Sequence, residues 1–167
     1  DYAEAYYNMG IALHGIVLNK PNRGLQKRII SLLDKKTYVK PEDIAKAAIS
    51  LLKFEPILQK YLQLVDDNVA QNPLDVISDL SDLPLLMKLM SVCSLPDLEL
   101  EWLFTKLRCC ILSNISSLKE ASPELIGFQS ALALQCFTNE YVYDYTYEEE
   151  ETLNSLDTGV KKAFENN

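Results

Sequence analysis

Proline divides this sequence into short segments, and most of these segments have the apolar spacing of an α-helix. Pro41, Pro56, Pro73, Pro84 and Pro123 each stand before a run in which apolar residues recur at intervals of three and four. That interval is the repeat of one face of a helix. Proline is tolerated at the first position of a helix, where its missing N–H would have no partner. The sequence therefore predicts an all-α protein, an irregular multi-helix bundle of about seven or eight helices.

The pattern divides the chain into three parts. Residues 1–18 are predicted to form a first helix, residues 19–146 the bundle, and residues 147–167 an acidic C-terminal helix or tail. Residues 141–147 alternate in the manner of a β-strand, but the sequence has no second β-rich run to pair with them. We interpret this run as a helix end that passes into an extended link.

The charge balance argues against two classes of partner. The formal net charge is −8 and the isoelectric point is about 4.7, whereas a phosphate backbone is bound by surplus lysine and arginine. One basic cluster exists, and we interpret it as a solvated face. Its members are Arg23, Lys27, Arg28, Lys35, Lys36 and Lys40. We therefore predict no nucleic acid and no membrane as partner.

The cysteines and the single histidine do not suggest a chemical site. The sequence has no CxxC pair, and adjacent Cys109 and Cys110 would point about 100° apart on a helix, too far to chelate one ion. We predict reduced, buried thiols and therefore a cytoplasmic location. His14 is the only imidazole available to activate a nucleophile, and we assign it a surface or packing role. The sequence predicts no catalytic residue, no metal and no cofactor.

One polar cluster follows the most apolar run of the chain and leaves two interpretations open. Gln135 and Asn139 are four residues apart on one helix face, and Glu140 is nearer the buried stripe. They could line a polar pocket or a domain contact, or Glu140 could be a structural carboxylate satisfied by Arg108, Lys106 or a helix end. We favour the structural interpretation. The acidic run 148–151 is likewise interpreted as solvated residues at a helix start rather than a site for a cation or basic peptide.

The opening residues resemble the first helix of a tetratricopeptide repeat. In the segment Ala3-Glu4-Ala5-Tyr6-Tyr7-Asn8-Met9-Gly10-Ile11-Ala12-Leu13, that motif is matched by Tyr6, Met9, Gly10 and Leu13. The resemblance covers about 13 residues and implies the last half-repeat of an array, or a cap. A severed repeat end leaves its stacking face open. The resemblance therefore implies that Tyr2, Tyr6 and Tyr7 are exposed anchors of an interaction surface.

Later runs resemble a helical region of bacterial proteins that also carry tetratricopeptide repeats. In those proteins the region precedes a class I S-adenosylmethionine-dependent methyltransferase domain. The resemblance rests on residues 38–45, 95–101 and 135–143. The Gly-rich cofactor loop of such a methyltransferase is not in this sequence, since no GxG occurs. The resemblance implies a partner domain downstream, and an opening Asp1 without Met indicates a processed end or a piece of a longer chain.

These observations favour a non-catalytic helical protein-interaction or scaffolding module, a connector next to a tetratricopeptide array. Its expected partner is a protein: a neighbouring domain, a repeat array or a second copy of the chain. One alternative is an accessory or regulatory domain of a methyltransferase. Another is a small helical ligand-binding domain with a pocket at Gln135, Asn139 and Glu140.

Overall fold

A computed structural model describes residues 2–35, 38–66, 72–115, 122–138 and 146–165, and these residues are almost entirely helical. The helices are α1 (Tyr2–Leu13), α2 (Arg23–Asp34), α3 (Pro41–Leu52), α4 (Pro56–Asp66), α5 (Pro73–Ser81), α6 (Pro84–Met90), α7 (Leu98–Ser113), α8 (Pro123–Thr138) and α9 (Tyr147–Glu165). The all-α prediction is confirmed. The described residues form nine helices rather than seven or eight, because the C-terminal segment, for which helix or tail was left open, is the helix α9.

The helices begin where local chemistry predicts. Proline occupies the first position of α3, α4, α5, α6 and α8, where its fixed φ suits the helix. Asn22, Asn72 and Asp97 cap α2, α5 and α7, and the side chain of each accepts a hydrogen bond from a backbone N–H in the first turn. Each cap satisfies one of the amides that a helix start leaves without an intrahelical partner.

The core is centred on α6, the shortest helix. It packs against α2, α3, α5 and α8, and Leu85, Leu86, Leu89 and Met90 are buried on it. In α3, Ala45, Ala47 and Ala48 are buried together, and their small side chains let neighbouring helices approach closely. A helix that is apolar on most of its surface must be covered on most sides, which accounts for the four neighbours of α6.

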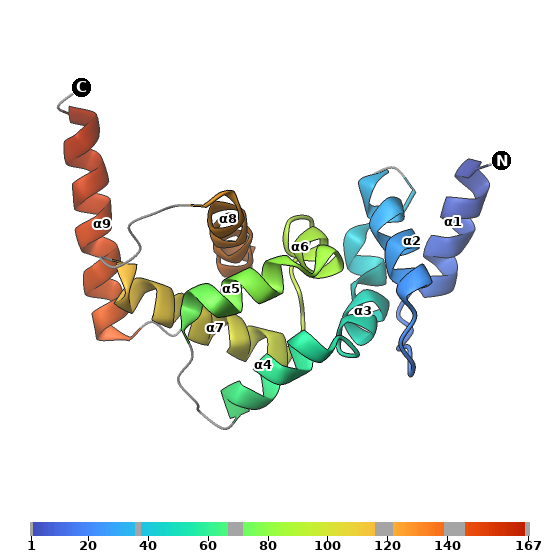
Figure 1. Cartoon of the computed structure of the whole chain (residues 1–167). Coiled ribbons are helices and arrows are strands. Elements are labelled where there is room, and N and C mark those ends of the chain that lie inside the picture. The colour runs from blue at the N-terminus through green and yellow to red at the C-terminus, as the bar shows by residue number, and fades with distance from the viewer. Residues whose placement is uncertain (1, 36–37, 67–71, 116–121, 139–145, 166–167) are drawn as a thin grey trace.

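The helices form an open arch rather than a closed bundle (Figure 1). Helices α4, α5 and α7 make its base, α1 stands at one end, and α9 rises from the other. Helix α8 lies between α9 and α6 (Figure 1). Within the described residues, no helix is both long enough and apolar enough to cross a membrane.

The first helix is shorter than the predicted span of residues 1–18, because it ends at Leu13. Gly15 takes a positive φ of 66°, a left-handed conformation that glycine adopts without steric cost. Its amide donates to the carbonyl oxygen of Asp43, 3.2 Å away, rather than continuing the helix. A contact with a distant part of the chain therefore fixes the end of α1.

Helix α1 packs chiefly against α3, whereas α2 packs chiefly against α6 and α3. In the tetratricopeptide pattern, Gly10 would admit the following helix closely. In the structure Gly10 is buried and admits the side chain of Val39, a residue of the segment that leads into α3. The resemblance of residues 3–13 thus predicts a close contact at Gly10. In the structure this contact is made by Val39 rather than by the following helix.

Candidate functional site

Of the predicted polar cluster, the structure describes Gln135, whose side chain bonds the backbone between two other helices. Gln135 lies on α8 and is 1% exposed. Its side-chain amide nitrogen donates to the carbonyl oxygens of Met90 and Cys93, each 2.8 Å away. Its side-chain oxygen accepts from the backbone N–H of Leu95 at 3.1 Å. Gln135 therefore holds the connection between α6 and α7 against α8 and faces the protein interior.

Asn139 and Glu140 lie outside the described residues. The pocket predicted from these three residues therefore stays a prediction, of which only Gln135 is placed. Arg108, one of the partners that we expected for Glu140, bonds the carboxylate of Glu149.

The acidic run at the start of α9 contains a buried residue that the sequence interpretation assigned to solvent. Glu149 is 3% exposed, and its Oε1 accepts from Nε of Arg108 at 2.9 Å. Thr146 and Glu149 also form a capping box. The backbone N–H of Thr146 donates to Oε2 of Glu149 at 2.9 Å, and the N–H of Glu149 donates to the hydroxyl of Thr146 at 3.2 Å. The pattern Thr-x-x-Glu is the sequence signal for this arrangement.

Two opposed effects set the protonation of Glu149. Burial raises the pKa of its carboxyl group. The hydrogen bonds from Arg108 and from the amide of Thr146 outweigh burial and hold the pKa below its ordinary value. Glu149 is therefore a charged partner of Arg108 that attaches the first turn of α9 to α7. This pair is structural, because both side chains are buried in the protein.

The three tyrosines that we predicted as exposed anchors differ in their exposure. Tyr2 and Tyr7 are exposed, at 87% and 57%. Tyr6 points inward and is half-buried. Its ring stacks on Tyr38 with centroids 5.8 Å apart, and its hydroxyl lies 3.1 Å from the hydroxyl of Ser31. Tyr6 thus attaches α1 to the body of the protein, and Tyr7 is the tyrosine on its open face.

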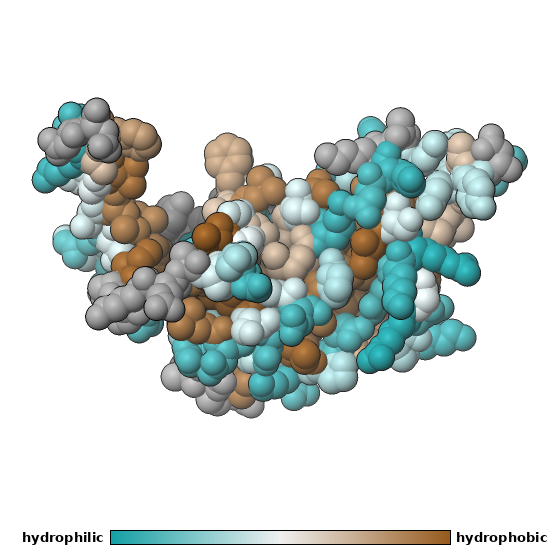
Figure 2. All heavy atoms as spheres, turned by 45° about the horizontal axis from the view of Figure 1, so that its top comes forward, coloured by the Kyte–Doolittle hydropathy of each residue, from teal (hydrophilic) through white to brown (hydrophobic). Residues whose placement is uncertain are grey.

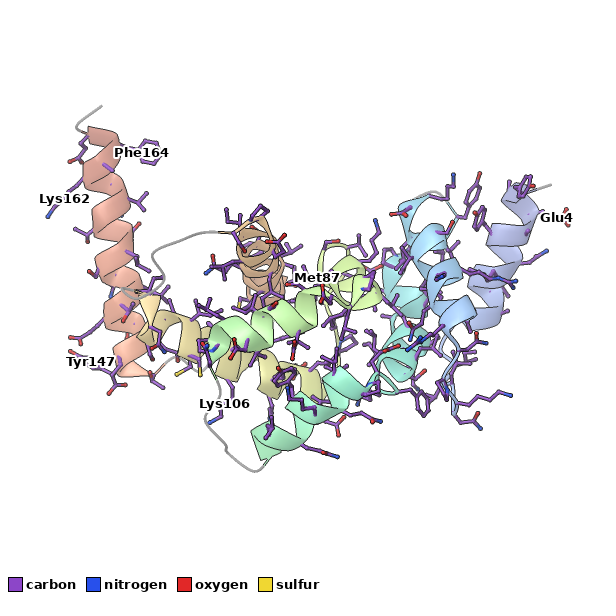
Figure 3. All side chains as sticks on the ribbon, viewed as in Figure 1. Glu4, Met87, Lys106, Tyr147, Lys162 and Phe164 are labelled. Carbon is purple, nitrogen blue, oxygen red and sulfur yellow. The ribbon has the colours of Figure 1, made fainter. Side chains whose placement is uncertain are left out.

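The open face of α1 has little charge. Its exposed residues are Glu4, Ala5, Tyr7, Asn8, Ile11 and Ala12. Ile11 is 59% exposed, one helical turn after Tyr7. A hollow of about 370 Å³ adjoins this face, and Tyr7, Ile11 and His14 line it opposite Val39 and Asp43. Glu4, labelled in Figure 3, is the only charged residue among the six.

A second hollow lies at the other end of the arch, between α7, α8 and α9. Its volume is about 430 Å³, and its lining includes Leu112, Leu132, Phe137 and Leu153. Figure 2 shows apolar residues on the side of α9 that faces the body of the protein. Phe164 projects from that side and Lys162 from the opposite side (Figure 3).

Potential metal ligands, the Cys93 thiol and His14 lie as follows in the described residues. No group of three or more potential ligands lies together in the part of the chain that the structure describes. Burial, and then the charge of Glu42, raise the pKa of the Cys93 thiol to about 12, so that it is protonated and unreactive at neutral pH. His14 is exposed, with Nε2 3.8 Å from a carboxylate oxygen of Asp43.

No protein-family model, no curated protein and no solved structure matches this chain.

Proposed function

We propose that this chain is a non-catalytic protein-interaction module, a helical connector that docks a neighbouring helical domain on the open face of α1. The observation that carries the proposal is the composition of that face. Tyr7 and Ile11 are exposed on the terminal helix of the arch, beside a hollow of about 370 Å³. Solvated helix faces are ordinarily polar and charged, and this one has a single charge, that of Glu4.

The size of the side chains on this face indicates what would fit it. Ala5 and Ala12 are exposed as well, at the other edge of this face beyond Glu4 and Asn8. Small residues let a second helix approach closely, while the tyrosine and isoleucine supply apolar contact area. These features are compatible with the stacking surface of a repeat array, which is the partner implied by the tetratricopeptide resemblance.

The test is to supply such an array. Two consensus tetratricopeptide repeats, fused ahead of residue 1 of the full chain, should stack on α1 and raise the denaturant midpoint at which α1–α3 unfold. Stability in stacked arrays includes a term for each interface between neighbours. Ile11→Asp should remove this gain, since it places a charge in the apolar contact.

Val17→Asp is the matched control, because Val17 is 64% exposed and lies outside α1. It should keep the gain from the fused repeats. If the repeats and the chain unfold independently of each other, or if both variants behave alike, the open face of α1 is not a docking surface.

A further inference from the structure

Helix α9 leaves the body of the protein soon after its first turn. Glu149 is buried against α7, yet every residue from Leu153 to Glu165 is exposed. This exposed stretch is longer than three helical turns. Isolated helices of such length are marginal in water, and a solvated helix face is expected to be polar.

The exposed stretch has an apolar stripe instead. Leu153, Leu156, Val160 and Phe164 follow one another at intervals of three or four residues, and Phe164 is 79% exposed. At 100° per residue they fall on one face of the helix, the same face that Glu149 presents to α7. The stripe therefore extends the face of α9 that packs on α7 into a part of the helix that no described residue covers.

The charges beside the stripe are arranged for pairing with an antiparallel copy. Asp157 and Lys161 lie on one edge of the stripe, and their side chains form an ion pair at 2.6 Å. Consider two α9 helices that run antiparallel about a two-fold axis between Thr158 and Gly159. Leu153 then falls opposite Phe164, and Leu156 lies beside Val160.

In that register the same edges of the two helices meet. Asp157 of each copy comes beside Lys161 of the other, twice by symmetry, which is the self-complementary pattern of a two-fold interface. A parallel pair would instead place this edge against the one that contains Thr152, Gly159 and Ala163, which has no charge. Apolar matching and charge matching thus select the same antiparallel arrangement.

We propose that the chain forms a two-fold dimer through antiparallel pairing of α9, with Leu153, Leu156, Val160 and Phe164 as its apolar seam. The pairing brings Phe164 of each copy to Leu153 of the other, at the rim of the hollow of about 430 Å³ between α7, α8 and α9. This surface is at the opposite end of the arch from α1, so the dimer does not depend on the function proposed above.

The test is the mass of the full chain in solution, by sedimentation equilibrium over a range of concentrations. The wild-type chain should reach the mass of two copies. Val160→Glu should raise the dimer dissociation constant about a hundredfold, because it places a charge in the apolar seam. Val160 is 54% exposed in the single chain, so the far-UV circular dichroism of this variant should still show a folded protein.

Ser155→Glu is the matched control, since Ser155 is exposed on the face of α9 opposite the stripe and the charge change is the same. It should leave the dimer intact. Lys161→Asp should weaken the dimer, and the double variant Asp157→Lys with Lys161→Asp should restore it, because the reciprocal pairs return with their signs exchanged.

Three results would overturn the proposal. One is a chain that stays monomeric up to about 1 mM, including the case in which α9 binds a different protein. Another is a dimer that Val160→Glu leaves unchanged or that Ser155→Glu disrupts equally. The third is a charge exchange at residues 157 and 161 that does not restore pairing.

Discussion

At the scale of single residues, the polar side chains buried in the described chain are Arg108, Gln135 and Glu149. Each joins elements that are distant in the sequence. Gln135 bonds backbone atoms 40 to 45 positions away, and Arg108 bonds Glu149 across 41 positions. Buried polar groups are costly unless they are hydrogen-bonded, so these residues specify how α6, α7, α8 and α9 meet.

Replacing Gln135 should show this directly. Gln135→Leu leaves the carbonyls of Met90 and Cys93 and the amide of Leu95 without their side-chain partner. An unsatisfied buried group costs about 1–3 kcal/mol, and we expect a loss of about 3 kcal/mol in the free energy of unfolding. Urea denaturation measures it.

Gln129→Leu is the control on the same helix, because Gln129 is only partly buried and lines the hollow between α7, α8 and α9. We expect a change within about 0.5 kcal/mol. Equal effects of the two substitutions would mean that the hydrogen bonds of Gln135 do not account for its contribution to the free energy of unfolding.

Glu149 should make stability depend on pH. Its folded pKa is below its ordinary value, and the unfolded value of a glutamate is about 4.3. The unfolded chain therefore binds the proton first as the pH falls. The stabilisation by Glu149 is complete above about pH 4.3 and is lost progressively as the pH drops towards the folded pKa.

Glu149→Gln should flatten that dependence below about pH 4.3, and it should cost about 3–5 kcal/mol at neutral pH by leaving Arg108 buried beside an uncharged group. Denaturant unfolding at a series of pH values provides the measurement. Glu151→Gln, at an exposed position of the same helix, should do neither. A Glu149→Gln variant with the wild-type pH profile would contradict this account.

At the scale of helices, α1 depends on the space at Gly10. A Cβ built at this position would lie 3.1 Å from Cγ2 and 3.2 Å from Cβ of Val39, and Val39 packs against the core. Gly10→Ala should therefore destabilise the protein by about 1 kcal/mol, since the cost of overpacking exceeds the gain in helix propensity. Thermal and urea unfolding would both detect it.

Gly127 provides the matched control, because it also lies inside a helix but has no neighbouring atom within 4 Å of an added Cβ. Gly127→Ala should stabilise by about 0.5–1 kcal/mol through helix propensity alone. Adding Val39→Ala to Gly10→Ala should relieve the crowding. If Gly10→Ala stabilises the protein as much as Gly127→Ala does, the contact with Val39 does not exclude a side chain at position 10.

The helices themselves could largely be predicted from sequence, because their starts are set by local chemistry. Pro41 or Asp97 acts through its own backbone and its first turn. The end of α1 could not be predicted, since it depends on the carbonyl of Asp43. The inward position of Tyr6 depends on Tyr38 and Ser31. Apolar periodicity gives the buried side of a helix but not the residue that packs on it.

The candidate site was harder to predict for the same reason. Gln135 and Glu149 differ little in sequence from solvated neighbours, and only the tertiary contacts with the α6–α7 connection and with Arg108 show them to be buried. The Thr146-x-x-Glu149 capping box was the one local signal available. The exposure of Tyr7 and Ile11, by contrast, follows from the position of α1 at the end of the arch.

At the scale of the whole molecule, the arch has one end at α1 and the other at α9, and each end has an apolar face exposed to solvent. Large exposed apolar patches on soluble domains mark interaction sites. The two proposed contacts are different in kind. The face of α1 is nearly uncharged and small-residue-rich, whereas α9 has a narrow stripe with charges along one edge.

Among the described residues, the buried ion pair of Arg108 and Glu149 lies at the first turn of α9, and the rest of the helix extends away from it as an exposed arm. Among the described helices, α9 contacts chiefly α7; Glu149 is buried in this contact, and Phe164 lies 15 positions further along. At 1.5 Å per residue that arm is about 22 Å long. A tilt of about 10° at the ion pair would therefore move Phe164 by about 4 Å.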